Sequence, residues 1–114
     1  MNKPHPIKEG ILKKYTNMVK GFQKRYFVLY SDMLVYYKSQ DKKEDDPKKI
    51  HLKCVDIVPN RNDTITINTG THSFKLKFET IAEKVEWLNA LKYTQQKFEN
   101  FDKSPDLDAS KQLS

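Results

Sequence analysis

The chain has 114 residues, of which 37% are hydrophobic and 32% are charged, and its formal net charge is +6. A chain of this length supports one hydrophobic core and therefore one domain. No apolar run approaches the ~20 residues that span a bilayer, and residues 1–10 lack the apolar segment of a signal peptide. These features argue against a membrane-spanning or secreted chain. We therefore expect a cytoplasmic protein whose contact with a membrane is peripheral.

The positive charge is concentrated near the N-terminus. Residues 1–30 contain seven basic residues against one acidic residue, a difference that equals the +6 of the whole chain. Such a localised excess indicates an anionic partner, which is an acidic lipid, a nucleic acid or an acidic protein.

Metal and enzyme chemistry are not indicated. The single Cys54 is expected to be a small buried hydrophobe, and the three histidines lie far apart in the sequence, without metal-ligand spacing. No Gly-rich phosphate loop or nucleophile–base pair stands out, and we interpret the Asp45–Asp46 pair as part of a solvated loop. We expect neither a cofactor nor an enzyme.

Seven short strands are predicted in the first 78 residues. Apolar and aromatic runs mark them, and Asn, Gly, Ser and Asp mark the turns between them. The short connections imply antiparallel pairing, and a sheet of this size with one apolar face must curl or close to bury that face. The predicted strands are 10–16, 23–30, 33–38, 50–52, 55–58, 64–68 and 73–78.

A helix is predicted after the last strand. Thr80 and Glu83 have the spacing of a capping box, in which each side chain accepts from a free amide of the first turn. An amphipathic helix of roughly 16–20 residues, with Trp87 flanking its apolar stripe, would plug one end of the barrel. The apolar stripe consists of Ile81, Val85, Leu88, Leu91 and Phe98.

We predict three segments along the chain. Residues 1–7 contain two prolines and form a flexible lead-in, and residues 8–100 form the domain. Residues 101–114 contain few apolar side chains and are predicted to be a disordered tail or linker.

This order of seven strands and a closing helix that contains Trp87 resembles the pleckstrin-homology (PH) domain. The resemblance covers residues 8–98. It implies a mostly β fold, a seven-stranded antiparallel barrel capped by one C-terminal α-helix.

The first hairpin resembles one subfamily in particular. Residues 9–29 read EGILKKYTNMVKGFQKRYFVL, which is similar to the hairpin of the PH domains of oxysterol-binding proteins, the ceramide transfer protein and the four-phosphate adaptor proteins. The resemblance implies binding of phosphatidylinositol 4-phosphate at the Golgi or at membrane contact sites, within a lipid-transfer or adaptor protein. It also implies a small GTPase as a candidate second partner.

Lys14 and Arg25 are the main candidates for a headgroup site, and we expect them to face each other across the hairpin. A phosphate monoester carries almost two negative charges, and Arg can donate to it in a bidentate fork. Gln23 stands where readers of 3-phosphorylated lipids usually have a basic residue, which favours a monophosphate. The nearby cations Lys20 and Lys24 are further candidates and keep the number of phosphates open, and the Tyr36 hydroxyl could donate to a phosphate. The resemblance adds Lys48 (or Lys49) and His51 as headgroup-binding candidates.

Structural roles stay open for several of these side chains. Lys14 could be a solvated strand lysine, Arg25 a member of a surface ion pair, Tyr36 a core residue and His51 a half-exposed strand residue. Met18 and Val19, by contrast, lie at a predicted loop tip where burial inside the protein is hard to arrange.

Met18 and Val19 are therefore candidates for insertion among lipid headgroups, with the basic flank attracting an anionic surface. The resembled subfamily uses the same loop as a membrane wedge. Two incidentally exposed apolar residues are the alternative.

Two rival functions are weighed against lipid binding. A protein-interaction module on the same fold would bind a peptide by adding a strand to a sheet edge. A single-strand nucleic-acid binder would need exposed stacking aromatics, whereas the aromatics of residues 22–37 fall mostly in core positions. We expect a monomer that binds anionic phosphoinositides and no nucleic acid.

Overall fold

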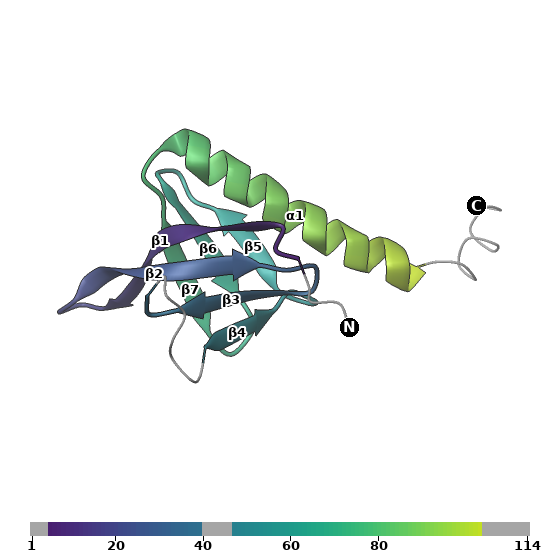
Figure 1. Ribbon diagram of the computed structural model, residues 1–114, viewed down its shortest axis with the longest axis horizontal. Coiled ribbons are helices and arrows are strands. Elements are labelled where there is room, and N and C mark those ends of the chain that lie inside the picture. The colour runs from purple at the N-terminus through teal and green to yellow at the C-terminus, as the bar shows by residue number, and fades with distance from the viewer. Residues whose placement is uncertain (1–4, 40–46, 104–114) are drawn as a thin grey trace.

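Seven antiparallel strands in one sheet, followed by a single helix, make up the computed structural model (Figure 1). It describes residues 5–39 and 47–103, with side chains up to residue 97. The Asp45–Asp46 pair, residues 1–4 of the predicted lead-in and residues 104–114 of the predicted tail lie outside the described residues. The elements are β1 (Lys8–Asn17), β2 (Gly21–Leu29), β3 (Met33–Tyr37), β4 (Lys48–His51), β5 (Asp56–Pro59), β6 (Thr64–Asn68), β7 (Ser73–Lys77) and α1 (Ile81–Lys103).

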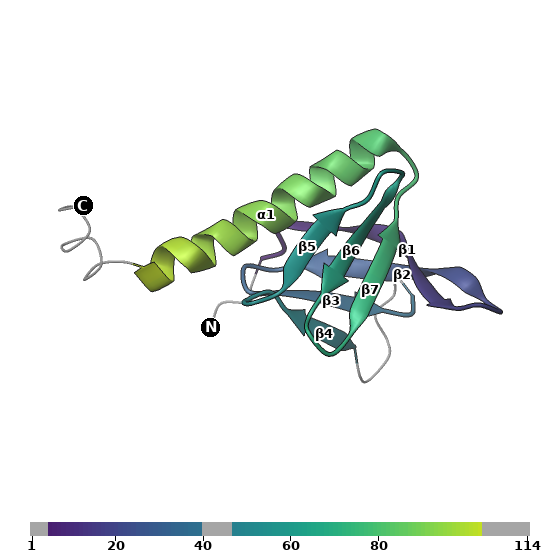
Figure 2. The ribbon, with the colours of Figure 1, turned by 180° about the vertical axis from the view of Figure 1, so that it is seen from behind.

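The sheet has the strand order β4-β3-β2-β1-β7-β6-β5. Strand β1 pairs with β2 on one side and with β7 on the other, so the first and last strands of the chain are neighbours. The sheet curls about this seam, with β2, β3 and β4 on one side and β5, β6 and β7 on the other (Figures 1 and 2). The predicted fold class is confirmed.

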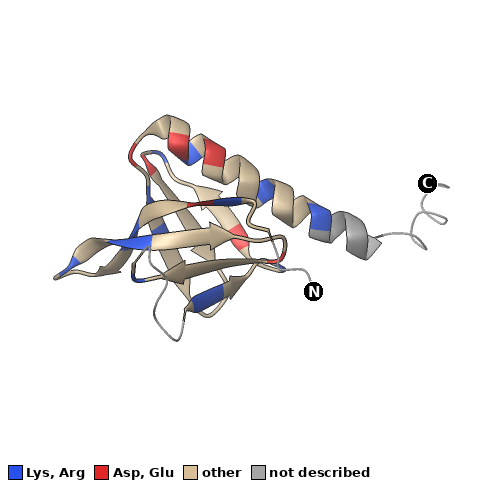
Figure 3. Cartoon of the chain, in the orientation of Figure 1, with Lys and Arg blue, Asp and Glu red and all other residues tan. Residues whose placement is uncertain are grey.

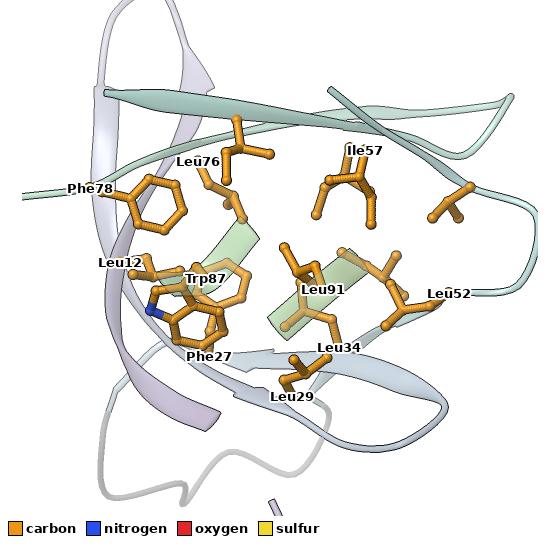
Figure 4. Close-up of a cluster of buried hydrophobic side chains, with 14 residues drawn as sticks. Leu12, Phe27, Leu29, Leu34, Leu52, Ile57, Leu76, Phe78, Trp87 and Leu91 are labelled. Atoms are coloured by element: carbon orange, nitrogen blue, oxygen red, sulfur yellow. The ribbon is translucent and has the colours of Figure 1, made fainter. Parts of the chain in front are cut away.

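Fourteen buried hydrophobic residues fill the space inside the curled sheet (Figure 4). Their strand members alternate along each strand, because successive side chains point to opposite faces of a sheet. Trp87 and Leu91 enter this core from α1, with exposed fractions of 2% and 0%. The helix packs against β5 and β6. In the part of the chain that the structure describes, no helix is long and apolar enough to cross a membrane.

The buried face of α1 differs from the predicted stripe. Ile81 and Val85 are 56% and 46% exposed, whereas Lys84, Trp87, Leu91 and Thr94 are buried. Two polar residues thus lie on the core side, and the side chain of Phe98 lies outside the described residues. The prediction was confirmed for Leu88 and Leu91, which pack in or against the core, and wrong for Ile81 and Val85. An apolar pattern does not predict polar side chains whose partners lie elsewhere in the fold.

Those partners are backbone carbonyls. The Lys84 ammonium donates to Asn60 O at 2.5 Å and to Asn62 O, so its stem packs inside while its charge is satisfied. The Thr94 hydroxyl donates to Ala90 O at 2.9 Å. Lysine 84 therefore fastens the start of the helix to the turn between β5 and β6.

The cap of α1 follows the prediction with one change. The Thr80 hydroxyl oxygen accepts from the Glu83 amide at 3.0 Å. The Glu83 carboxylate accepts from the amide of Glu79 at 3.0 Å, one residue before the expected position. Both bonds satisfy amides that lack a partner within the helix.

Cys54 is exposed, so the prediction of a buried cysteine was wrong. It lies in a turn between β4 and β5 and has a left-handed φ of 68°. The predicted strands 50–52 and 55–58 already left Cys54 in the connection between them. The expectation rested on the usual burial of free cysteines, which does not hold at this exposed turn.

Candidate functional site

The β1–β2 hairpin projects beyond the rest of the barrel (Figure 1). Its turn is held by local bonds: Asn17 Oδ1 accepts from the amides of Val19 and Lys20 at 3.0 and 2.8 Å, as Asx turns do. Gly21 ends the turn at φ 64°, a conformation that favours glycine. The tip is thus shaped by its own sequence, without support from the core.

Met18 and Val19 form that tip and are 92% and 93% exposed. The chain folds them away from every apolar partner in the described structure, as the sequence predicted. Because the Asn17 bonds fix the turn, the two side chains are presented together at the end of the hairpin.

Lys14 and Arg25 lie on the inner face of the sheet, but they are not direct partners. Lys14 pairs with Gln23, and Arg25 pairs with Leu12, so the two cations are diagonal neighbours. The expectation that they face each other was correct for the face and wrong for the register. Diagonal neighbours on one face remain within reach of long side chains.

The ammonium of Lys14 lies over two aromatic rings. Its Nζ is 5.5 Å from the ring centroid of Tyr36 and 5.5 Å from that of Phe74. Burial lowers the pKa of Lys14, and the positive charge of Arg25 lowers it further. Both effects disfavour the charged form, and an anion bound beside it would oppose them.

Aromatic side chains form the floor of this inner-face cluster. The Tyr36 ring stacks on Phe27 at 5.0 Å and meets Phe74 edge-on at 6.5 Å, and Phe74 in turn stacks on His72 at 6.1 Å. Burial raises the pKa of Tyr36 despite the opposing charge of Arg25. Its hydroxyl is therefore neutral at physiological pH and can donate a hydrogen bond. Tyr36 thus both packs on the core and faces the cations.

Arg25 forms no ion pair with a described carboxylate, and neither does Lys14. One guanidinium nitrogen, Nη1, donates to Lys24 O at 2.7 Å. This bond orients the group and leaves its other donors for a ligand. The surface ion pair considered as an alternative for Arg25 is absent among the residues that the structure describes.

The remaining candidates divide into three groups. Lys48 is the register partner of Tyr36 and is exposed on β4, beside the inner-face cluster. His51, at the far end of β4, lines a hollow of about 370 Å³ that shares Phe74 with the cluster. Lys20 lies in the hairpin turn.

Lys24 belongs to the opposite face of the sheet. It pairs with Lys13, and both residues are one position away from the inner-facing Lys14 and Arg25. The structure therefore separates Lys24 from the cluster with which the sequence grouped it. The period-2 alternation of strands could have shown this from the sequence.

Gln23 has a role that the sequence did not reveal. Its side-chain amide donates to Lys20 O at 2.8 Å and to Phe22 O at 3.3 Å. The residue therefore helps to hold the hairpin turn, while it contributes no positive charge to the inner face.

The chemistry available here is anion binding. Two cations without described carboxylate partners, a neutral phenol and an exposed lysine surround an aromatic floor on the inner face, near the end of β3 and the start of β4. Within residues 5–39 and 47–97, no group of three or more His, Cys, Asp or Glu is placed to hold a metal ion.

Comparisons with known proteins agree with this architecture. A sequence model of the PH domain matches residues 6–96. Human oxysterol-binding protein-related protein 9 is 33% identical over 94 residues, which cover 77% of this chain and 13% of that protein. The chain therefore spans a small part of the curated relative that it matches.

Two solved structures are similar as well. The solution structure of the PH domain of human oxysterol-binding protein-related protein 11 has 28% identity and a TM-score of 0.69, and the match covers 78% of this chain and 79% of that one. The C-terminal PH domain of pleckstrin, in complex with D-myo-Ins(1,2,3,4,5)P5, has 27% identity and a TM-score of 0.68, covering 80% and 99%.

Proposed function

This chain belongs to the PH domain family, and we propose on that premise that it is a non-catalytic module that binds phosphatidylinositol 4-phosphate on a membrane surface. The observation that carries the proposal is the pair Lys14 and Arg25, diagonal neighbours on the inner face without a described carboxylate partner. Like charges held together in this way favour a bound anion.

The arrangement suits a phosphate monoester. Such a group carries up to two negative charges and three strong acceptor oxygens. The free donors of Arg25 can bind two of these oxygens in a fork, and the Lys14 ammonium supplies a second charge. The Tyr36 hydroxyl and Lys48 can reach a ligand from the next two strands.

Gln23 supports a monophosphate over a more highly phosphorylated headgroup. It lies directly opposite Lys14 but is uncharged, and its amide is bonded to carbonyls of the hairpin turn. A third cation is therefore missing at the position closest to the pair. Phosphorylation at the 4-position in particular rests on the similarity of residues 9–29 to the oxysterol-binding protein group.

Insertion of the hairpin tip would complete membrane binding. Burying Met18 and Val19 among lipid headgroups contributes roughly 1–2 kcal/mol for each side chain. Their exposed fractions show that this apolar surface is available. By the same resemblance, the proposed setting is the Golgi or a membrane contact site, within a lipid-transfer or adaptor protein that also binds a small GTPase.

Vesicle flotation with a panel of single phosphoinositides tests the proposal. We expect preferential binding to vesicles with phosphatidylinositol 4-phosphate in ~150 mM salt, where non-specific attraction is screened. Lys14→Gln and Arg25→Gln should each weaken this binding about tenfold, as expected for loss of a charged hydrogen bond.

Lys92→Gln is the matched control, since it removes the same charge from an exposed position on α1. It should leave binding within about twofold. Equal binding to all anionic vesicles, or losses no larger than that of the control, would contradict a specific headgroup site. Binding to single-stranded oligonucleotides under the same conditions would favour the nucleic-acid alternative instead.

A further inference from the structure

Part of the apolar stripe of α1 stays exposed after the helix has packed on the core. Ile81 and Val85 are 56% and 46% exposed, and Leu88 is only partly buried. Side chains three or four positions apart lie on the same side of a helix, so this side continues from Leu88 to Lys92, which is exposed. That side of α1 therefore offers an apolar surface that ends at a cation.

This side of α1 borders strand β5. The Lys84 ammonium donates to Asn60 O, just after the strand, and the Gln95 amide donates to Val55 O at 2.6 Å, just before it. The two contacts place β5 alongside α1 but in the opposite direction, as Figure 2 shows. A groove of about 480 Å³ lies between the two elements. Its lining consists of residues 54–58, Lys92 and Gln95.

The outer edge of β5 has no strand beside it. This strand is the last in the sheet order and pairs with β6 alone. Residues 56–59 form no other backbone hydrogen bond with the rest of the described chain. An unpaired edge presents N–H and C=O groups to a further strand. Val58, which is 48% exposed, lies on this edge, and Pro59, which has no amide hydrogen, ends it. The edge therefore has room for one short strand.

An unpaired strand edge beside an apolar helix side fits an extended peptide. All strand pairs of this sheet are antiparallel, so we expect an added strand to run from the Pro59 end of β5 to its Asp56 end. Alternate side chains of such a strand point to the same face. Those near Pro59 would meet Ile81 and Val85 of α1. The one near Asp56 would meet Lys92.

The charge of the groove at that end favours a carboxylate. Lys92 forms no ion pair with a described acidic side chain. Within residues 81–97 the acidic residues of α1 lie in its first two turns, whereas Lys92 and Lys97 lie farther along (Figure 3). Asp56 also lines the groove, but it is exposed while its neighbour Ile57 is buried, so its carboxylate points to the outer face of the sheet. A peptide carboxylate that faces α1 is therefore directed to Lys92.

The dimensions of the two elements agree. Ile81 and Lys92 are separated by about 16 Å along the helix axis, at a rise of about 1.5 Å per residue. The first and fifth residues of a strand are about 14 Å apart, and a long lysine side chain bridges the difference. Three alternate side chains of one peptide thus reach from Ile81 to Lys92.

We propose that the groove between β5 and α1 binds an extended peptide of a partner protein, which adds to β5 as a further antiparallel strand. Three alternate side chains of this peptide face α1: two apolar ones and then a carboxylate. The groove shares no lining residue with the cluster around Lys14 and Arg25 or with the hairpin tip. Peptide and headgroup can therefore be bound at the same time, and the inference does not depend on the proposed lipid ligand.

A synthetic array of seven-residue peptides, acetylated and amidated at their ends, is the first probe. Its forward set has Val at the second and fourth positions and Asp at the sixth, with varied uncharged residues between them. The reversed set has Asp at the second position and Val at the fourth and sixth. We expect the protein to bind forward peptides several-fold more tightly than their reversed counterparts, because reversal places the carboxylate against apolar side chains and leaves Lys92 unpaired. Equal binding of the two sets, or no binding to either, would overturn the inference.

NMR titration with the strongest forward peptide locates its site on the protein. The methyl signals of Ile81, Val85 and Leu88 and the backbone amides of residues 56–58 should shift. In Lys14→Gln/Arg25→Gln the affinity for the peptide should stay within about twofold. Shifts confined to the β1–β2 hairpin would overturn the inference. Loss of headgroup binding with intact peptide binding would contradict the proposed function alone.

Two substitutions in α1 test its two contributions to the groove. Val85→Ser should weaken peptide binding about tenfold through lost apolar burial. Its matched control is Tyr93→Ser, an exposed position turned about 100° from Lys92 around the helix, which should change binding less than about twofold. Lys92→Glu should reverse the charge preference, so that peptides with Lys at the sixth position bind better than those with Asp, whereas Lys97→Glu should keep the preference for Asp. Equal effects of a variant and its control would overturn the site.

N-methylated peptides separate strand addition from docking of side chains alone. The amides of a strand point alternately toward and away from its neighbour. Methylation of the alternate amides that face β5 should abolish binding, and methylation of the other alternate set should leave the affinity within about twofold. Equal tolerance of both sets would show that the backbone does not pair and would overturn the proposal. Retained signal dispersion in each protein variant checks that the fold is intact.

Discussion

The ammonium of Lys14 lies 5.5 Å from the centroid of the Tyr36 ring, on the inner face of the barrel. The ring is half-buried and belongs to a row of stacked aromatics, so the lysine has an apolar floor beneath it and a guanidinium beside it. Burial and the neighbouring Arg25 disfavour the charged form of Lys14 in the unliganded protein, and a bound anion would offset both effects. Function and stability are therefore opposed at this residue.

The first prediction concerns Lys14→Met. Removing the charge removes the cost of partly burying an ammonium and its repulsion by Arg25. The methionine side chain can still pack on the two rings. We expect the free energy of unfolding to rise by about 0.5 kcal/mol, a small gain because the site is largely solvated. Binding of glycerophosphoinositol 4-phosphate should fall about tenfold or more.

Denaturant unfolding and isothermal titration calorimetry measure the two effects. Lys92→Met serves as the matched control, since Lys92 is exposed on α1, and it should change neither quantity appreciably. A destabilised Lys14→Met protein would contradict the unfavourable environment inferred for this lysine.

Headgroup binding should depend on pH in a way that reports Lys14. At the acid side, binding weakens as the phosphate monoester gains a proton near pH ~6. At the alkaline side, Lys14 loses its proton below the ordinary lysine pKa of about 10.4, because its pKa is lowered. Binding should therefore decline at a lower pH than lysine normally sets.

Lys14→Arg keeps the charge at alkaline pH, because arginine is protonated throughout this range. Headgroup binding by this variant should therefore decline only at a higher pH than in the parent, even if its binding near neutrality is weaker. Titration calorimetry at a series of pH values measures both the acid and the alkaline decline in headgroup binding. Identical alkaline limbs for the two proteins would show that another group controls this decline.

Stability at high pH should depend on Tyr26. Its hydroxyl donates to the Glu9 carboxylate, and this bond, together with burial, raises the pKa of Tyr26 to about 12. Because the unfolded-state value is about 10, the folded state holds the phenolic proton more tightly. The resulting stabilisation is present below pH ~10 and is lost as the pH rises to about 12.

Tyr26→Phe lacks this proton. It should be about 1 kcal/mol less stable than the parent near neutrality, through the lost hydrogen bond. The difference between the two proteins should shrink as the pH rises from about 10 to about 12. Thermal unfolding across this range makes the comparison, and a difference that stays constant with pH would refute the coupling.

Lys84 should matter for stability, although lysines at helix surfaces usually do not. It is 8% exposed, and its ammonium donates to the carbonyls of Asn60 and Asn62. Lys84→Met preserves the packed stem but leaves both carbonyls without their donor, which costs about 2 kcal/mol.

Urea unfolding measures this loss. Lys92→Met, on the exposed side of the same helix, should stay within about 0.5 kcal/mol of the parent. Faster amide exchange in the turn between β5 and β6 should accompany the loss in Lys84→Met. Equal stabilities of the two variants would show that the carbonyls of Asn60 and Asn62 can hydrogen-bond to water instead, at no cost in stability.

The hairpin tip should affect membrane binding alone. Met18→Ser/Val19→Ser removes apolar side chains that are more than nine-tenths exposed, so unfolding should be unchanged. Vesicle affinity should fall about tenfold or more through lost insertion, while the affinity for the soluble headgroup stays the same.

Ile81→Ser/Val85→Ser is the comparison variant, because both residues are exposed apolar side chains on α1. It should leave vesicle binding unaffected. Equal losses at the tip and on the helix, or a parallel loss of soluble-headgroup affinity in the tip variant, would argue against insertion.

Much of the fold followed from the sequence. Local rules sufficed for the number of strands, the closing helix, the cap at Thr80 and the exposed tip at Met18 and Val19. In each case the signal lies within a few residues: alternation of apolar side chains, turn chemistry or capping spacing. The predicted strand ends were less accurate, and the exposure of Cys54 in its turn was missed.

The sequence by itself determined that seven strands and a helix form, and that the cations gather in the first hairpin. Alternation within each strand separates Lys24 from Arg25, but only the tertiary structure decided which cations of β1 and β2 share a face. Register between strands depends on the turn and on the irregularity between Tyr15 and Asn17, and a one-residue slip moves every side chain to the other face. The observed register places Lys14 and Arg25 diagonally on the inner face and pairs Lys24 with Lys13 on the outer face. The burial of Lys84 likewise required carbonyls more than 20 residues away in the chain, which no local pattern encodes.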